Sequence, residues 1–286
     1  MIAVLLVGGE GTRLRPLTEW LPKPMLPIAN RPFLEHQIDH LRRHGIDRVV
    51  MACGYLSDSI REHFGDQLSY RVEPEPLGTG GAIRFAAADV DETFVVCNGD
   101  VLTDLDLSAQ VRMHRQRRAR ATLAVHEVAD AAAYGLVESD DDGRVTRFVE
   151  KGATGPGGIN AGSYVMEPDV LELIEPGRAV SVEREVFPRL IGDGLFARTD
   201  GARWRDIGTP ESYLWANLEQ MPAGGLIDPT ATVDEDAQLT DCVVGPGARV
   251  HAGARLERCV VLEGAPVSST ASYIERVIGR DGSPVW

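Results

Sequence analysis

An alternation of strand-like and helix-like segments along residues 1–200 is the feature that most constrains the fold of this chain. Apolar runs such as IAVLLV (residues 2–7) and TFVVC (residues 93–97) have the length and the β-branched content of buried strands. Between such runs, residues 31–45 place apolar side chains at helical spacing and end at a glycine. The alternation predicts an α/β fold with a Rossmann-like, mostly parallel sheet flanked by helices.

Three loops follow the apolar runs, at Gly8, at Gly54 and at residues 98–100. In an open parallel sheet the carboxyl ends of the strands lie at one edge, and ligands bind outside that edge. We therefore expect the three loops to lie together and to contribute to a ligand site.

Two segments further along the chain have the pattern of β-hairpins. One surrounds the dipeptide Asp142-Gly143 and the other surrounds Asp200-Gly201. Asp-Gly is typical of tight hairpin turns, because both residues tolerate a positive φ. These antiparallel additions predict a lid or a substrate-side subdomain.

A repeat distinguishes the C-terminal segment. TDCVVGPGARV and ERCVVLEGAPV align at an offset of 17 residues, which places Cys242 on Cys259. Hexapeptide repeats of this kind form a left-handed β-helix with about 18 residues in each coil. After a linker at residues 221–225, we predict a short left-handed β-helix over residues 226–286, separate from an α/β domain over residues 1–221. A pair of ordinary β-hairpins is the alternative for the tail.

So short a stack of coils leaves an open end, which predicts packing against the main domain or against another subunit. We therefore expect a homo-oligomer. No apolar run is long enough to span a membrane, and the N-terminal run is too short for the core of a signal peptide. A cytoplasmic protein that does not bind membranes is the expectation.

The acidic composition argues against one class of partner. The 286 residues carry a net charge of −14, whereas nonspecific nucleic-acid binding needs a basic surface. We expect no nucleic-acid partner, and we interpret the basic stretch at residues 112–120 as a solvated helix face. The four cysteines form no CxxC pair, which argues against zinc. The spacing of His36, His40 and His44 indicates one helix face rather than a metal site.

The stretch GGEGTRLRPLTEWLPKPM (residues 8–25) places glycines directly after the first strand, where backbone N–H groups can meet an anion. It contains no GxxxxGK[ST] pattern, and Leu14 stands where a dinucleotide fingerprint has its third glycine. Arg13 and Lys23 supply a guanidinium and an ammonium, which both suit phosphate. A tight turn alone is the alternative for the glycines, and the two cations favour phosphate binding.

The pattern GGxGTRLxPLT followed by PKPM resembles the motif of the sugar-1-phosphate nucleotidyltransferases, also called NDP-sugar pyrophosphorylases. Further segments are similar to those of the family and come in the same order along about residues 1–220: EPEPLGTGGA, NGD, YGLVE, FVEK, INAGSYVM and WRDIGTPESYL. LVGG, PLGTGGA and SVEREVFP (residues 181–188) are most similar to mannose-1-phosphate guanylyltransferases. The tail resembles the hexapeptide-repeat segment of many members.

The resemblance implies that residues 1–221 are a nucleotidyltransferase catalytic domain. A nucleotidyl group would pass from an NTP, with GTP favoured, to a sugar 1-phosphate, with mannose 1-phosphate favoured. Attack would be in line and assisted by Mg²⁺, and the products would be an NDP-sugar and pyrophosphate. The alternatives are another NTP, a sugar-like cyclitol phosphate, or a noncatalytic regulatory subunit that binds NDP-sugars.

The resemblance also implies roles for single residues. Arg13, Lys23, Asp100 and Asp206 are the expected catalytic residues, and Asp100 and Asp206 are the expected metal ligands. The expected nucleotide-binding residues are Leu6, Gly8, Gly9, Gly11, Thr12, Arg13, Glu75, Gly78, Thr79, Gly80, Asn98 and Asp100. The expected sugar-phosphate-binding residues are Gly135, Glu150, Lys151 and Asn160. Gly152 stands where the family usually has proline, which leaves the shape of that sugar-side loop open.

Overall fold

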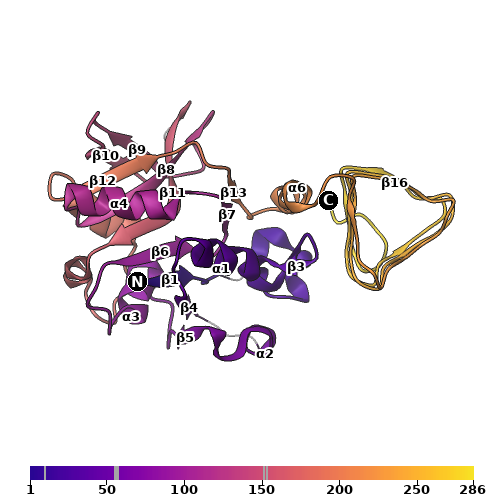
Figure 1. Cartoon of the computed structure of the whole chain (residues 1–286), viewed down its shortest axis with the longest axis horizontal. Helices are drawn as coiled ribbons and strands as arrows, with labels where there is room; N and C mark the ends of the chain where they lie inside the picture. The colour runs from indigo at the N-terminus through magenta and orange to yellow at the C-terminus, as the bar shows by residue number, and fades with distance from the viewer. Residues whose placement is uncertain (10, 55–57, 151, 153) are drawn as a thin grey trace. The chain divides into compact units, whose positions relative to one another are not determined.

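The computed structural model describes residues 1–9, 11–54, 58–150, 152 and 154–286, and the chain divides into two compact units (Figure 1). The first unit contains residues 1–9 and 37–204, and the second contains residues 10–36 and 205–286. The second unit thus joins the segment after the first strand to the C-terminal part of the chain. Among the described residues, no helix has both the length and the apolar character needed to cross a membrane.

The first unit is built on a mixed sheet that has nine strands within the described residues. Four of them, in the order β6-β1-β4-β5, pair in parallel, which confirms the predicted parallel sheet. On the other side of β6 the sheet continues with antiparallel β11 and then with the remaining strands. The nine strands are β1 (Ile2–Leu6), β4 (Arg48–Cys53), β5 (Ser69–Val72), β6 (Phe94–Asn98), β8 (Ala121–Val128), β9 (Leu136–Ser139), β10 (Val145–Val149), β11 (Gly157–Met166) and β12 (Leu195–Thr199).

The register of the parallel strands places the predicted loops at one edge. Leu6 pairs with Ala52 of β4 on one side and with Asn98 of β6 on the other. The loops that begin at Val7, Gly54 and Gly99 therefore leave the sheet at neighbouring points of its carboxyl edge, as the sequence predicted.

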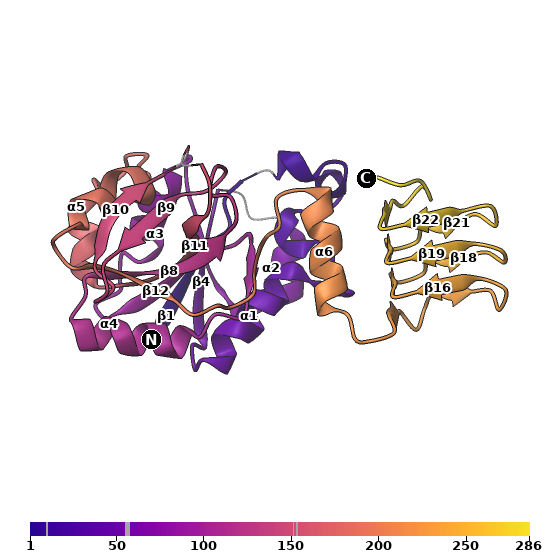
Figure 2. The same ribbon diagram turned by 90° about the horizontal axis from the view of Figure 1, so that it is seen from above.

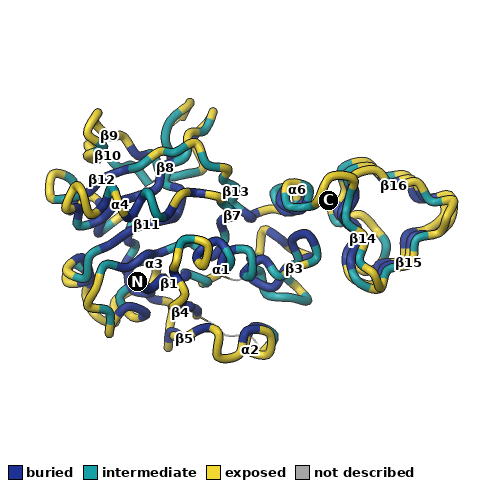
Figure 3. The backbone as a smooth tube through the Cα atoms, viewed as in Figure 1, coloured by how far each residue is buried: buried dark blue, intermediate teal, exposed yellow. Residues whose placement is uncertain are grey.

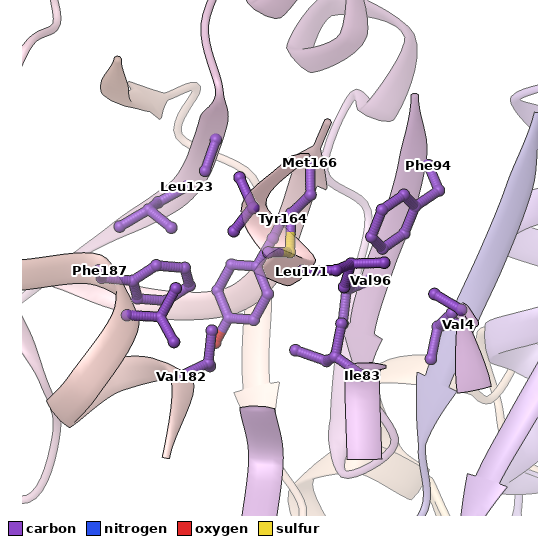
Figure 4. Close-up of a cluster of buried hydrophobic side chains, with 14 of the residues drawn as sticks. Val4, Ile83, Phe94, Val96, Leu123, Tyr164, Met166, Leu171, Val182 and Phe187 are labelled. Carbon is purple, nitrogen blue, oxygen red and sulfur yellow. The ribbon is translucent and has the colours of Figure 1, made fainter. Parts of the chain in front are cut away.

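Helices cover both faces of this sheet, as expected. On one face, Leu123 of β8 joins buried side chains from three helices, and Figure 4 shows Ile83, Val182 and Phe187 around the ring of Tyr164. Thr122, the residue before Leu123 in β8, points to the opposite face, because successive side chains of a strand alternate. The α-helices and longer turns of the first unit after α1 are α2 (Asp58–Phe64), α3 (Gly78–Ala86), α4 (Leu107–Arg117), η5 (Pro168–Leu173), the π-helix η6 (Val182–Val186) and α5 (Phe187–Leu190).

Helix α4 covers that opposite face. His114 of α4 is buried and its Nδ1 lies 2.9 Å from the hydroxyl of Thr122. The outer side of α4 carries Arg112 and Arg117. Arg112 pairs with Asp106 at 3.7 Å, and Arg117 pairs with Asp142 at 3.4 Å. Residues 112–117 of the basic stretch therefore lie on a helix with acidic neighbours, as predicted, whereas residues 118–120 follow the end of the helix.

The predicted helix at residues 31–45 is α1 (Phe33–Arg43). The four apolar residues predicted on one face are all buried: Phe33, Leu34, Ile38 and Leu41. Gly45 follows with a φ of 74°, a conformation in which glycine readily ends a helix.

One of the two predicted hairpins is confirmed and the other is wrong. β9 and β10 pair in antiparallel fashion around the turn that contains Asp142-Gly143. Near Asp200-Gly201 the preceding strand, β12, instead pairs in parallel with β8. The residues after that turn form hydrogen bonds with a different segment. The Arg203 N–H and guanidinium both donate to the carboxylate of Asp104. A local turn motif was thus overridden by long-range pairing.

The C-terminal part of the second unit consists of short parallel strands stacked in three sheets, β14-β17-β20-β23, β15-β18-β21 and β16-β19-β22 (Figure 2). Equivalent strands are 17 residues apart, as in the pairing of Val243 with Val260. The parallel pairing excludes the alternative of hairpins and confirms the predicted left-handed β-helix. Cys242 and Cys259 are both buried in the hydrophobic core of the coils. Figure 3 shows buried and exposed stretches of backbone alternating around these coils. The strands are β14 (Leu226–Ile227), β15 (Thr232–Val233), β16 (Gln238–Thr240), β17 (Val243–Val244), β18 (Arg249–Val250), β19 (Arg255–Glu257), β20 (Val260–Val261), β21 (Pro266–Val267), β22 (Ser272–Ile274) and β23 (Val277–Ile278).

Helix α6 (Pro210–Gln220) belongs to the second unit and is hydrogen-bonded to the segment that precedes α1. Its buried Asn217 accepts a hydrogen bond from the backbone N–H of Ala29, and its Tyr213 hydroxyl donates to the carbonyl of Pro27 at 2.6 Å. The side-chain amide of Asn30 donates to the Val244 carbonyl of the β-helix at 2.9 Å. The segment before α1 is thereby bonded both to α6 and to the β-helix.

Candidate active site

The carboxyl ends of β1 and β6 meet at Gly99. Its N–H donates to the Leu6 carbonyl at 2.8 Å, and a Cβ on Gly99 would lie 2.6 Å from the same oxygen. Only glycine permits this approach, so the NGD motif is tied directly to the end of the first strand. Gly8 and Gly9 follow the end of β1. Among the described residues, a Cβ at either position would meet no atom within 4 Å.

Gln37 holds the loop that carries Asp100, a role that the sequence analysis missed. Its buried side-chain amide donates to the carbonyls of Asn98 and Val101, at 3.0 and 2.9 Å. These two bonds secure the backbone on both sides of Asp100. A signal was present, because Gln37 falls on the apolar face of α1, three residues after Leu34, where a polar side chain must find buried partners.

The expected base-binding loop forms the start of α3. Glu73 is buried and its carboxylate accepts the Leu77 N–H at 2.9 Å. The glycines that follow pack against residues 178–182, since a Cβ on Gly78 would lie 2.6 Å from the Val180 carbonyl oxygen. The N–H of Gly80 donates to the same oxygen at 2.8 Å. The structure gives Gly78 and Gly80 a packing role. Their expected contact with a base stays a prediction.

Thr79 and Glu75 differ in their surroundings. The Thr79 hydroxyl donates to the Glu183 carboxylate at 2.6 Å, so this side chain is engaged within the protein. Glu75 and Gly78 are exposed. The first N–H groups of a helix have no partner inside the helix, which leaves those of Gly78 and Thr79 as the candidate donors of this loop.

The sugar-side residues Gly135, Glu150 and Asn160 are brought together in the first unit. A Cβ on Gly135 would lie 3.3 Å from the Glu150 carbonyl oxygen and 3.7 Å from the Cβ of Asn160. The Asn160 side-chain amide donates to the Tyr164 hydroxyl at 2.9 Å. Burial raises the pKa of Tyr164 well above its ordinary value, so this phenol stays protonated. Lys151, the fourth expected residue, lies outside the described residues.

The Glu150 carboxylate is bound by a residue that the sequence analysis did not assign. Arg184 donates to it from Nε at 3.0 Å and from Nη2 at 3.3 Å. Arg184 belongs to SVEREVFP, one of the segments that resemble mannose-1-phosphate guanylyltransferases.

An aromatic cluster flanks Asn160. The indole of Trp204 stacks on His126 at a centroid distance of 5.5 Å and meets Tyr134 edge-on at 5.3 Å. Its Nε1 donates to the Ala161 carbonyl at 2.9 Å. These contacts fix the irregular stretch of β11 that follows Asn160.

In the second unit the two cations occupy one folded segment. Gly11 has a φ of 61°, and its carbonyl accepts the Thr18 hydroxyl at 2.9 Å. A Cβ on Gly11 would lie 3.6 Å from the Lys23 Cβ, so the loop folds back on itself. Thr12, Arg13 and Leu14 form the short turn η1 between these contacts.

Arg13 and Asp206 meet at Gly208. A Cβ on Gly208 would lie 3.0 Å from Asp206 Oδ2 and 3.1 Å from Arg13 Nη2. Two expected catalytic residues that are far apart in sequence therefore lie beside the same glycine. Among the described residues no group of three or more His, Cys, Asp or Glu side chains is arranged to hold a metal ion.

Parallel strands flanked by helices, with loops gathered at the carboxyl ends of the strands, define a Rossmann-like α/β protein. A family model described as nucleotidyl transferase matches residues 2–221. The chain belongs to this family, the sugar-1-phosphate nucleotidyltransferases.

Curated relatives and a solved structure agree with this assignment. The mannose-1-phosphate guanylyltransferase of Mycobacterium tuberculosis is 45% identical in an alignment of 223 positions that covers 74% of this chain and 62% of that protein. The mannose-1-phosphate guanylyltransferase catalytic subunit beta of Danio rerio is 35% identical over 82% of this chain and 74% of its own length. The crystal structure of HddC from Yersinia pseudotuberculosis complexed with GMP-PN superposes with a TM-score of 0.66 at 32% identity, over 76% of this chain and 98% of that one.

Proposed function

We propose that the protein transfers a nucleotidyl group from an NTP, with GTP preferred, to a sugar 1-phosphate, with mannose 1-phosphate preferred. The products are an NDP-sugar and pyrophosphate. The observation that carries the proposal is the meeting of Arg13 and Asp206 at Gly208, within a chain whose family is that of nucleotidyl transfer. The names of the relatives support the choice of guanine and mannose.

Arg13 and Lys23 would carry most of the phosphate chemistry. The sugar-phosphate oxygen attacks the α-phosphorus, the bond to the β-phosphate oxygen breaks, and the electrons of that bond leave with pyrophosphate. The reaction needs charge neutralisation and alignment more than a covalent nucleophile. Arg13 would bind the departing phosphates in two parallel bonds, and Lys23 would act as a point charge. Gly8, Gly9, Gly11 and Thr12 would leave room for the triphosphate.

Mg²⁺ is the proposed cofactor, with Asp100 and Asp206 as its protein ligands. Mg²⁺ is usually held by one or two carboxylates together with substrate phosphates and water, which suits a pair of aspartates. When bound, the ion would neutralise phosphate charge and align the reacting groups. Gln37 would keep Asp100 in place through its two bonds to the NGD loop.

The remaining residues would provide selectivity. The N–H groups at the start of α3 would face the base, with Glu75 nearby and with Leu6 and Asn98 at the sheet edge. Gly135, Glu150 and Asn160 would contact sugar hydroxyls, and Lys151 would hold the sugar phosphate. Sites that hydrogen-bond a hydroxyl reject analogues that lack it.

We also propose that residues 1–221 carry the reaction and that residues 226–286 form a separate supporting β-helix. A cytoplasmic location and a homo-oligomer belong to the same proposal. The chain spans 62% of the length of the Mycobacterium relative, so the relative carries additional sequence.

The test is a matrix of four NTPs against several sugar 1-phosphates, scored by pyrophosphate release with and without Mg²⁺. We expect the largest kcat/KM for GTP with mannose 1-phosphate, and loss of turnover with EDTA. Asp100→Asn and Arg13→Ala should each reduce kcat/KM by about a hundredfold or more. Asp106→Asn is the matched control, because Asp106 caps α4 and asparagine caps a helix equally well. Binding of GDP-mannose without turnover of any pair would instead show a noncatalytic protein.

A further inference from the structure

We propose that Arg184 is a positioning residue of the sugar-1-phosphate site, and that the short helix carrying it links this site to the nucleotide loop. The inference rests on the proposed function. Arg184 Nε donates to Glu150 Oε2 at 3.0 Å, and Arg184 Nη2 donates to Glu150 Oε1 at 3.3 Å. Two roughly parallel bonds fix both the plane and the rotation of a carboxylate, which one point charge cannot do.

The pair is suited to orienting Glu150 rather than to stabilising the fold. The Arg184 side chain is 68% exposed and that of Glu150 is 24% exposed. Ion pairs with this much solvent contribute little to folding. A carboxylate held at both oxygens still has further lone pairs, and these now point in set directions. Glu150 can therefore present defined acceptors to sugar hydroxyls beside Gly135 and Asn160.

The same turn contacts the nucleotide loop through the preceding residue. Glu183 accepts hydrogen bonds from the hydroxyls of Thr79 at 2.6 Å and Ser181 at 2.8 Å. The Ser181 hydroxyl in turn accepts the N–H of Arg184 at 3.2 Å. Residues 181–184 are thus bonded to the start of α3 on one side and to Glu150 on the other.

A physical coupling follows from this arrangement. The turn is part of η6, a π-helix, and such irregular turns are uncommon and frequently occur at functional sites. A nucleotide bound at the start of α3 would restrict Thr79 and, through Glu183, the turn that carries Arg184. Glu150 would then be oriented before the sugar 1-phosphate arrives, so that the nucleotide increases the affinity for the sugar.

The test compares Arg184→Gln and Arg184→Lys with the wild type. We expect Arg184→Gln to raise KM for mannose 1-phosphate about tenfold, while KM for GTP changes less than about twofold. Arg184→Lys should raise KM for mannose 1-phosphate less than Arg184→Gln does but still above the wild-type value, because an ammonium lacks the two parallel donors of a guanidinium. Arg147→Gln is the control, since Arg147 forms a similar exposed pair with Glu138 at 2.9 Å. The control should leave both KM values unchanged.

A double-mutant cycle with Glu150→Gln separates positioning from direct contact. If Arg184 acts through Glu150, Arg184→Gln adds no further rise in KM to the Glu150→Gln variant. Additive losses would show that Arg184 contacts the substrate itself and would overturn the positioning role. An unchanged sugar KM in an active Arg184→Gln enzyme would also overturn it and leave the proposed function intact.

Absence of wild-type turnover would contradict the proposed function instead. Calorimetric titration with GDP-mannose then replaces kinetics. Weaker binding to Arg184→Gln than to the wild type would support the inference. Equal affinity, or no binding to either protein, would overturn it.

Discussion

The guanidinium of Arg280 lies over the indole ring of Trp20, with its central carbon 4.2 Å from the ring centroid. Trp20 belongs to the glycine- and proline-rich stretch that carries Arg13 and Lys23, whereas Arg280 lies just beyond the last strand of the β-helix. This cation–π contact adds to the Asn30–Val244 hydrogen bond between the same two regions. The β-helix therefore supports the segment that holds the proposed phosphate-binding cations.

Arg280→Gln should loosen this segment. A cation–π contact of this kind contributes about 0.5–1 kcal/mol, so we expect KM for GTP to rise about two- to fivefold if the contact holds the loop in its binding form. Steady-state kinetics at saturating mannose 1-phosphate measures this. Arg276→Gln is the matched control, because Arg276 lies over Trp286 at the end of the chain, 5.6 Å from that ring. Equal effects of the two changes would argue against a specific role for the contact with Trp20.

Gly78→Ala should destabilise the first unit. Gly78 has a φ of 67°, and an added Cβ would lie 2.6 Å from the Val180 carbonyl oxygen. Backbone strain and the clash together should cost about 2–4 kcal/mol in the free energy of unfolding. Chemical denaturation followed by circular dichroism measures the loss.

Gly177→Ala is the comparison for that variant. Gly177 has a φ of 73°, but an added Cβ would meet no atom of the described residues within 4 Å. The substitution should therefore cost only the strain, about 1 kcal/mol. If the two variants were equally stable, the close packing of Gly78 on Val180 would make no difference to the free energy of unfolding.

Gly208→Ala should affect activity more than stability. The new Cβ would approach Asp206 Oδ2 and Arg13 Nη2 to about 3 Å, and both are the ends of side chains that can move aside. Displacing them should lower kcat/KM about tenfold or more and leave the midpoint of unfolding almost unchanged. Gly201→Ala should show the opposite pattern, because Gly201 is exposed and has a φ of 67°. Wild-type kinetics in Gly208→Ala would contradict the proposed roles of Arg13 and Asp206.

His40 should make the protein less stable in acid. Burial, followed by the nearby His44 and Arg43, lowers the pKa of His40 from 6.5 to about 4, while Asp104 opposes this shift. Between these two values the unfolded chain binds a proton that the folded protein does not. The free energy of unfolding is therefore unaffected by His40 above pH 6.5. It falls by up to about 3 kcal/mol as the pH drops toward 4.

Urea unfolding at several pH values between 7 and 4 measures this slope. His40→Gln should flatten it, because glutamine does not titrate. His63→Gln, a change of an exposed histidine, should leave it as in the wild type. A residual slope in His40→Gln is expected from His114, whose pKa is also lowered by burial.

Local patterns predicted much of the fold. The apolar spacing of α1, the strand runs of the parallel sheet and the offset between Cys242 and Cys259 all correspond to structure that forms where it was expected. These features depend on the period of a helix, a strand or a coil, and each period is visible in a short window. The hairpin at Asp200-Gly201 failed because β12 pairs with β8, which is remote in sequence.

The sequence by itself determined the class of chemistry, through the residues that can carry it: two cations in the loop after β1, one aspartate after an apolar run and another in WRDIGT, and a glycine-rich start of α3. Tertiary structure decided how these residues are held. Gln37 secures the loop of Asp100, Val180 packs on Gly78, Arg184 orients Glu150, and Gly208 lies beside Arg13 and Asp206. Apart from the neighbours Asp206 and Gly208, each of these contacts joins segments remote from one another along the chain. Their partners depend on how strands and helices pack, and a short sequence pattern records only the spacing within one element.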